Sequence, residues 1–190
     1  MIWLANILKK NGYKPGIISR GYKSVSKKFP LSVDSDTQVY DSGDEAKIIS
    51  NSTQCPLVVG PKRVDSSKYL LDNYDCDVLI TDDGLQHYAL GRDIEIAMVD
   101  GIKKFGNKLM LPAGPLREPI KRLNEVDFIV NTNSFCNDES ERKQNEFLMT
   151  YKPISWINIC TKKTYEIHDW PYQKMVHAVA GISNPNNFFS

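Results

Sequence analysis

The residues best suited to chemistry stand in the segment Asp82-Asp83-Gly84-Leu85-Gln86-His87, directly after an apolar run at 78–81. Two adjacent carboxylates repel each other, so they must be solvated, hydrogen-bonded or neutralised by a cation. Mg²⁺ commonly binds one or two carboxylates together with substrate phosphates, and an acidic residue that ends a strand can hold it. An Asp pair alone is more typical of a solvated turn. The attached Gly-Leu-Gln-His favours a phosphate or metal site, because it adds a permissive backbone and two polar side chains.

His87 by itself is more typical of a structural side chain than of a metal ligand, because no second histidine stands at ligand spacing.

Another acidic pair, in Gly43-Asp44-Glu45, opens a predicted helix. The simpler interpretation is that Asp44 and Glu45 stabilise the helix start. The functional interpretation makes one of them a general base that accepts a hydroxyl proton near a transferred phosphate.

Three basic segments complete the candidate chemistry. A proline-framed loop at 112–119 holds Arg117 next to Glu118, and Arg can stabilise charge on a phosphoryl group in transfer. The alternative is an exposed turn with a weak surface ion pair. Arg20-Gly21-Tyr22 and Pro61-Lys62-Arg63 each follow a predicted strand, although each is also typical of an ordinary surface turn. The phosphate-binding pattern G-x-x-x-x-G-K-[ST] does not occur in these residues.

These residues need a scaffold that brings them together, and the hydrophobic pattern predicts one. Apolar runs of strand length alternate with segments of helical period. We predict helices at 2–10, 44–50, 63–73 and 139–151, a loop at 24–36, and strands at 16–19, 56–59, 77–81, 94–99, 128–130 and 155–159. The alternation predicts an α/β fold with a mostly parallel sheet and helices on both faces. Ligands of such sheets bind beyond the carboxyl ends of the strands, where the candidate residues stand.

The pattern changes near residue 174, where we place a domain boundary. We predict a main domain at 1–160, a linker at 161–174 and the start of a second, smaller α/β domain at 175–190. That second domain would open with a strand at 176–181 and the beginning of a helix at Asn184-Pro185.

Composition excludes several functional classes. The chain has 190 residues, with 24 Lys+Arg against 23 Asp+Glu and a formal net charge of +1, which argues against a strongly basic nucleic-acid binder. Its four cysteines are scattered without a C-x-x-C pair, so neither a zinc site nor a disulfide framework is expected. The apolar runs are too short to span a bilayer, and no signal peptide is visible. A soluble, cytosolic, mixed α/β protein is the expected class.

Taken together and in order, the motifs resemble tetraacyldisaccharide 4'-kinase, the lipid A 4'-kinase family of Gram-negative bacteria. The resemblance extends over essentially the whole chain, and the segments at 82–87 and 112–119 are the most distinctive. The segments that carry it are Ile18-Ser19-Arg20-Gly21-Tyr22, Gly43-Asp44-Glu45, Val59-Gly60-Pro61-Lys62-Arg63, Asp82-Asp83-Gly84-Leu85-Gln86-His87, Val99-Asp100-Gly101, Phe105-Gly106-Asn107, Leu111-Pro112-Ala113-Gly114-Pro115-Leu116-Arg117-Glu118-Pro119 and Ala180-Gly181-Ile182-Ser183-Asn184-Pro185.

The resemblance implies a kinase of P-loop NTPase fold that uses ATP and Mg²⁺. It would phosphorylate the 4'-hydroxyl of a tetraacylated glucosamine disaccharide 1-phosphate, giving lipid IVA at the cytoplasmic face of the inner membrane. The implied roles are catalytic for Asp44 (as base), Asp83 and Arg117, metal-binding for Asp82 and Asp83, cofactor-binding for Asp82, Gln86, His87 and Glu45, and substrate-binding for Tyr22, Arg63 and Glu118.

Three departures from the family pattern determine the expectation for this chain. The family's Gly-rich phosphate loop, its membrane-associating segment and a histidine of its C-terminal domain have no counterpart in these residues. We therefore expect an internal fragment that is inactive alone. Two alternatives stay open: a metal-dependent hydrolase that uses Asp82, Asp83 and His87, and a non-catalytic remnant that binds a partner chain.

Overall fold

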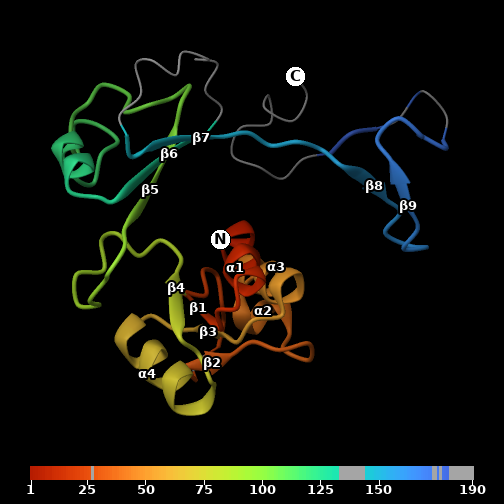
Figure 1. Cartoon of the computed structure of the whole chain (residues 1–190), viewed down its shortest axis with the longest axis horizontal. Helices are drawn as coiled ribbons and strands as arrows, with labels where there is room; N and C mark the ends of the chain where they lie inside the picture. Colours follow the sequence, from red (N-terminus) through yellow and green to blue (C-terminus); the bar gives the residue numbers. More distant parts are fainter. Residues whose placement is uncertain (27, 133–143, 173–174, 176, 180–190) are drawn as a thin grey trace.

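The computed structural model of the chain describes residues 1–26, 28–132, 144–172, 175 and 177–179, with its α-helices in the first half and mostly strands in the second (Figure 1). The elements in chain order are α1 Ile2–Lys10, β1 Pro15–Ser19, β2 Leu31–Ser32, α2 Val39–Ser42, α3 Asp44–Thr53, β3 Leu57–Val59, α4 Arg63–Asn73, β4 Val78–Thr81, β5 Ile96–Asp100, the 3₁₀ helix η1 Ile120–Asn124, β6 Phe128–Thr132, β7 Glu146–Met149, β8 Ser155–Ile157 and β9 Thr164–Glu166. None of the helices in the described ranges is long and apolar enough to cross a membrane.

The first sheet has the strand order β2-β3-β1-β4. Strand β1 lies between β3 and β4 and is parallel to both, with Ile18 opposite Val58 and Ile17 opposite Ile80. The short β2 is antiparallel to β3, and it lies in a segment that the sequence pattern predicts as loop. A two-residue strand is too short to leave an alternating pattern.

Successive side chains of each strand point to opposite faces of this sheet. Helices cover both faces, as predicted. On one face, Ile17 packs with Ala5 of α1 and with Ala46 and Ile49 of α3. On the other face, Ile18 and Val58 pack against Leu70 of α4. The central strands are continuous apolar runs because both of their faces are buried.

A second sheet, β5-β6-β7, is parallel throughout and has its own core of Ala97, Val99, Val126 and Ile129. We expected one sheet, but β4 and β5 do not pair among the described residues, and each lies at an edge of its sheet. The connecting segment 82–95 has no helix that could form a crossover on the first sheet. Instead, its Leu85 packs against the second core.

The helix predicted at 139–151 is wrong in its described part. Residues 146–149 form strand β7, with Phe147 opposite Val130 of β6 and its ring edge-on to Phe128 at 5.9 Å. The charged residues upstream gave the segment a helix-like composition, but pairing with β6 overrides that local preference. Residues 139–143 lie outside the described ranges.

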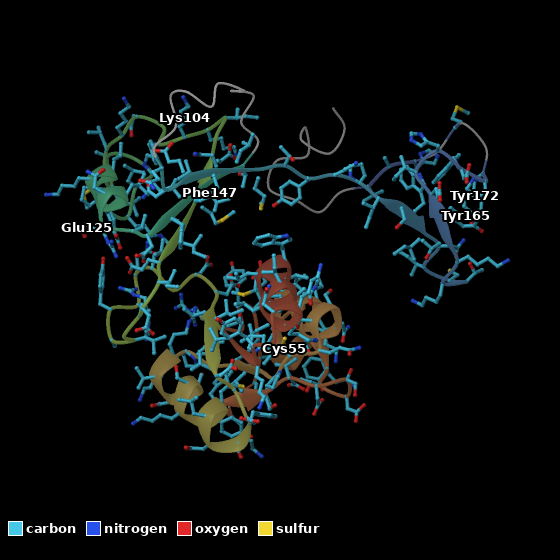
Figure 2. The ribbon with its side chains drawn as sticks, viewed as in Figure 1. Cys55, Lys104, Glu125, Phe147, Tyr165 and Tyr172 are labelled. Carbon is cyan, nitrogen blue, oxygen red and sulfur yellow. The ribbon has the colours of Figure 1, made fainter. Side chains whose placement is uncertain are left out.

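The last described elements, β8 and β9, form an antiparallel hairpin in which Trp156 lies opposite Tyr165. Aromatic rings pack on it: the ring centres of Tyr165 and Tyr172 are 6.1 Å apart (Figure 2). Trp170, which follows the hairpin, has its ring centre 4.8 Å from that of Trp156. The hairpin includes residue 160, where the sequence predicts the end of the main domain. The domain boundaries stay a prediction. Residues 177–179 form no strand, and the rest of the expected elements at 176–190 lies outside the described residues.

Candidate functional site

The carboxyl ends of β1, β3 and β4 meet at one edge of the first sheet, as the parallel pairing requires. A depression of about 300 Å³ lies there, lined by Glu45, Ile48 and Ile49 of α3 and by Asp82 and Asp83 after β4. The structure thus brings together three of the carboxylates that the sequence singled out. The apolar side wall formed by Ile48 and Ile49 was not anticipated, because a helix of such mixed composition does not show which face borders a ligand.

Asp82 extends the pairing of β4, because its backbone N–H donates to the carbonyl oxygen of Ile18 at 3.0 Å. Its half-buried position raises the pKa of the carboxyl above the usual 3.8, and the neighbouring charge of Asp83 raises it further. The amino group of Met1 and the guanidinium of Arg63 lower it, but these effects are smaller than that of burial. A carboxylate with this environment gains from a cation in the depression.

The backbone bends sharply after Asp82. Asp83 has a φ of +49° and an exposed side chain. Gly84 is buried so closely against the strand end that an added Cβ would lie 2.6 Å from Cγ2 of Thr81. The hydroxyl of Thr81 is itself buried without a hydrogen-bond partner. The glycine of the motif therefore lets the turn fold back over the end of β4.

Arg63 lies beneath this turn and is only 4% exposed. Its guanidinium donates to the carbonyl oxygen of Asp82 at 2.8 Å and to that of Gly60 at 3.4 Å, which ties the ends of β4 and β3 together. Burial lowers the pKa of this arginine, while the nearby charge of Asp82 raises it. The predicted contact of Arg63 with substrate stays a prediction, since its described contacts are with the protein.

The start of α3 is held against the turn that follows β1. Gly43 has a φ of +85°, and an added Cβ would lie 2.6 Å from the backbone oxygen of Tyr22. Tyr22 itself is 64% exposed. Asp44 is exposed in the first turn of α3, where its carboxylate accepts the N–H of Glu45 at 3.0 Å. Glu45 lines the depression, and Asp44 stands next to it without being part of the lining.

Arg117 and Glu118 lie in a loop between β5 and β6 of the second sheet, and hydrogen bonds within the loop hold its shape. Asn107 donates to the carbonyl oxygen of Ala113 at 2.9 Å, and the N–H of Leu111 donates to that of Leu116 at 2.8 Å. Arg117 is exposed and does not line the depression. Glu118 instead accepts a hydrogen bond from the hydroxyl of Tyr88 at 2.7 Å. This hydrogen bond connects the loop to the middle of the 82–95 segment.

Gln86 and His87 occupy the turn beyond Gly84. The N–H of His87 donates to the carbonyl oxygen of Gly84 at 2.9 Å, while the Gln86 side chain is exposed. Neither residue lines the depression. In the described part of the chain no three His, Cys, Asp or Glu side chains form a metal cage, so the three-ligand hydrolase hypothesis gains no support from the geometry.

A divalent cation that takes only one or two protein ligands fits this site better than a cation enclosed by three or more. Asp82 and Asp83 supply the hard oxygen donors that Mg²⁺ prefers, and Mg²⁺ usually takes only one or two carboxylates plus water and phosphate. Burial and the neighbouring Asp83 raise the pKa of Asp82, and a cation bound at the pair would offset both effects. The residues present therefore fit Mg²⁺ bound together with a phosphate ligand.

Comparison with known proteins bears on the whole chain. The model of the LpxK family, described as tetraacyldisaccharide-1-P 4'-kinase, matches residues 1–190. The chain is 47% identical to the tetraacyldisaccharide 4'-kinase of Nitrosococcus oceani over 190 residues and 45% identical to that of Shewanella frigidimarina, in each case covering 100% of this chain and 54% of the relative. The chain thus spans about half the length of the curated relatives it matches.

A solved structure is also similar. The crystal structure of LpxK from Aquifex aeolicus in complex with ATP superposes with a TM-score of 0.64 at 28% sequence identity, covering 78% of this chain and 47% of that one. The likeness agrees with the α/β architecture of parallel strands and flanking helices described above.

Proposed function

The chain belongs to the tetraacyldisaccharide-1-P 4'-kinase family, and on that premise we propose that its site serves the transfer of the γ-phosphoryl group of ATP to the 4'-hydroxyl of a tetraacyldisaccharide 1-phosphate. The product would be lipid IVA. The observation that carries the proposal is the depression at the sheet edge, where Asp82, Asp83 and Glu45 gather at the carboxyl ends of parallel strands. The ATP complex of the Aquifex aeolicus relative supports a nucleotide as the ligand.

Asp82 and Asp83 are the residues that would hold Mg²⁺ in this reaction. When bound, Mg²⁺ would neutralise charge on the nucleotide phosphates. The protein's own part is to hold the backbone that carries the pair: the N–H of Asp82 bonds to Ile18, and its carbonyl oxygen accepts a bond from the buried Arg63. Asp83 would face the reacting phosphate, because it is the more exposed of the pair.

The remaining predicted residues take the roles that their positions allow. We propose Asp44 as the base that accepts the proton of the 4'-hydroxyl, since it is exposed at the first turn of α3 beside the depression. Arg117, exposed on its braced loop, would stabilise charge on the transferred phosphoryl group. Glu45, Gln86 and His87 would support the nucleotide, and Tyr22, Arg63 and Glu118 the acceptor side.

The acceptor class also suggests where the protein works. A lipid with four acyl chains stays in a bilayer, so we propose that the protein acts at the cytoplasmic face of the inner membrane as a peripheral enzyme. We also propose the organisation that the sequence predicts, with a nucleotide-binding domain at 1–160, a linker at 161–174 and a second domain from 175.

The test is transfer of label from γ-labelled ATP to the disaccharide acceptor. Positioning and charge stabilisation supply most of the rate in such reactions, and the sequence carries no Gly-rich phosphate loop, so we expect slow transfer by this chain alone. The assay is therefore run with protein in excess over acceptor. We expect label at the 4'-position, dependent on Mg²⁺, and a loss of about 100-fold or more in Asp83→Asn.

The matched control is Asp169→Asn, which removes an exposed carboxylate in the β8–β9 region, away from the depression. It should transfer label as the wild type does. Label at a different hydroxyl, or transfer that Asp83→Asn leaves unchanged, would refute the proposal.

A further inference from the structure

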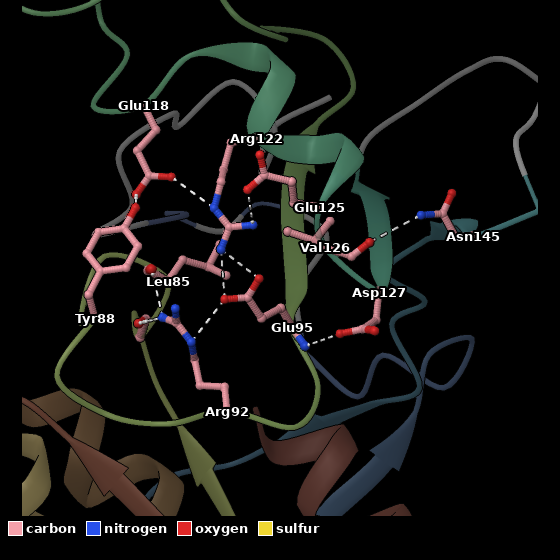
Figure 3. Close-up of polar contacts among 11 residues, drawn as sticks. Leu85, Tyr88, Arg92, Glu95, Glu118, Arg122, Glu125, Val126, Asp127 and Asn145 are labelled. Carbon is pink, nitrogen blue, oxygen red and sulfur yellow. Dashed lines mark hydrogen bonds and ion pairs between the residues drawn. The ribbon is translucent and has the colours of Figure 1, made fainter.

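A network of charged side chains connects the turn after β4 to the loop that carries Arg117 (Figure 3). Its centre is Glu95, just before β5, whose carboxylate pairs with two arginines from different parts of the chain. Arg92 approaches it with Nε at 2.9 Å, and Arg122 of η1 approaches it at 2.6 Å. None of these three residues belongs to the motifs that the sequence singled out.

One arm of the network holds the turn. Nη1 of Arg92 donates to the carbonyl oxygen of Gly84 at 3.0 Å and to that of Leu85 at 2.8 Å. These two carbonyls directly follow the Asp pair. The same guanidinium lies 5.5 Å from the ring centre of Tyr88, so its position is set on two sides.

The other arm holds the loop. Arg122 pairs with Glu118 at 3.5 Å and with Glu125 at 3.4 Å, and the hydroxyl of Tyr88 donates to Glu118 at 2.7 Å. Glu118 is the neighbour of Arg117 in the chain. Since Glu118 is drawn into the network and Arg117 is exposed, the network fixes the segment from which Arg117 projects.

The central pairs are shielded enough to matter. The side chains of Arg92, Glu95 and Arg122 are 16%, 13% and 19% exposed, whereas that of Glu125 is 66% exposed. Exposed ion pairs contribute little, but removing one partner of a shielded, hydrogen-bonded pair leaves the other charge uncompensated. Glu95 is therefore the one carboxylate that pairs with the arginines of both arms among the described residues, and Tyr88 adds a second, uncharged connection between them.

We propose that Glu95 is a positioning residue: by binding Arg92 and Arg122 together, it fixes the turn of Asp82 and Asp83 relative to the loop of Arg117 and Glu118. Its importance for catalysis rests on the proposed function, because that function assigns the two segments to one reaction. The mechanical coupling itself stands on the contacts alone.

The experiment is amide hydrogen exchange on the full chain, wild type against Glu95→Gln. The turn is reported by the N–H groups of His87 and Leu90, which bond to Gly84 and His87, and the loop by those of Leu111 and Leu116. We expect exchange to become about tenfold faster in both segments, since each loses a charge-assisted support. The N–H of Ile17 in the first sheet should keep its protection.

Three further variants sharpen the result. Glu95→Asp keeps the charge and should restore most of the protection. Glu125→Gln removes only the exposed member of the network and should change neither segment. Arg92→Lys is made in a Tyr88→Phe background, because Tyr88 contacts both Arg92 and Glu118 and would otherwise offer a second route to the loop. Through Glu95 it should still speed exchange at Leu116 by about threefold relative to Tyr88→Phe alone, and it is read in the same way if Glu95→Gln does not fold.

The proposal is overturned if only one segment responds, if neither does, if Glu125→Gln has the same effect as Glu95→Gln, or if Arg92→Lys leaves Leu116 unchanged. Loss of protection in both sheets of Glu95→Gln would also overturn it, because Glu95 would then serve general stability. The measurement needs neither nucleotide nor acceptor, so its failure is distinct from a failure of the label-transfer assay.

Discussion

Single residues at the sheet edge hold charges that the folded chain does not fully compensate. Asp82 is half-buried beside Asp83, and the Met1 amino group and Arg63 lower its pKa by less than burial raises it. Arg63 in turn is buried, and its Nε has no hydrogen-bond partner among the described residues. Such arrangements lower stability, and they are found at sites where a bound ligand supplies the missing charge or hydrogen-bond partner.

We predict that Asp82→Asn makes the folded chain more stable at pH 7. The folded chain holds the Asp82 proton above pH 3.8, where the unfolded chain has released it, so the stability of the wild type falls as the pH rises through this range. The substitution removes that cost. The measurement is the urea midpoint of both proteins between pH 4 and pH 8.

The gain should shrink as the pH falls toward 3.8, because both states then hold the proton. Asp169→Asn, at an exposed position, should show no such pH-dependent gain. An Asp82→Asn variant that is less stable than the wild type at every pH would mean that the raised pKa has been misassigned.

We also predict that Gly43→Ala costs about 3 kcal/mol of unfolding free energy, since both the backbone conformation and the approach to Tyr22 exclude a Cβ. Gly12→Ala is the matched control, because Gly12 has a similar φ of +88° but open space around the added methyl. It should cost about 1 kcal/mol. Equal costs in denaturant titrations would show that the contact with Tyr22 does not matter.

At the scale of elements, the helix α4 shows how one face of the sheet is closed. Leu70 is fully buried against Ile18 and Val58, whereas its neighbour Leu71 is 56% exposed. The two leucines therefore separate burial from helix propensity, which is the same for both.

We predict that Leu70→Ala lowers the unfolding free energy by about 2–5 kcal/mol, through lost burial and the cavity left behind. Leu71→Ala should change it by about 0.5 kcal/mol or less. Urea unfolding of the two variants provides the comparison, and similar losses for both would contradict the placement of α4.

The sequence predicted these elements unevenly, for physical reasons. The helix predicted at about 63–73 is confirmed, because its apolar residues Val64, Tyr69, Leu70 and Leu71 stand between two strand-like runs. Strands β1, β3 and β4 were also predicted, since buried parallel strands leave apolar runs. Strand β7 was missed because its pairing with β6 is non-local, and no period in a single segment reports such pairing.

The candidate site was predictable to a similar extent. The Asp82-Asp83 pair and Glu45 do meet, because strand ends of one parallel sheet share an edge. The network of Arg92, Glu95 and Arg122 could not be found in the sequence. Its members are separated along the chain and become neighbours only when the second sheet forms.

On the scale of the whole molecule, the chain divides its core between two sheets. The first is closed by α1, α3 and α4, and the second has a smaller core around Val99 and Ile129. The segment 82–95 connects them and carries both the turn of the site and the ion pairs of Glu95. Because the two sheets share no strand pairing in the part of the chain that the structure describes, their stabilities can differ.

We predict that Ile129→Ala speeds amide exchange in β5 and β6 without affecting β1, since Ile129 is 4% exposed and belongs to the second core. Met98→Ala, at a 56% exposed position on β5, should leave both sheets protected. Equal acceleration in both sheets of Ile129→Ala would show that they unfold as one unit.

The central claim is that Asp82 and Asp83 bind Mg²⁺ facing a nucleotide, and calorimetric titration with ATP tests it most directly. The account predicts that binding requires Mg²⁺, weakens by more than about tenfold in Asp82→Asn and in Asp83→Asn, and is unchanged in Asp169→Asn. Binding of ATP that is equally strong in EDTA, or that survives both substitutions at the Asp pair, would contradict the account.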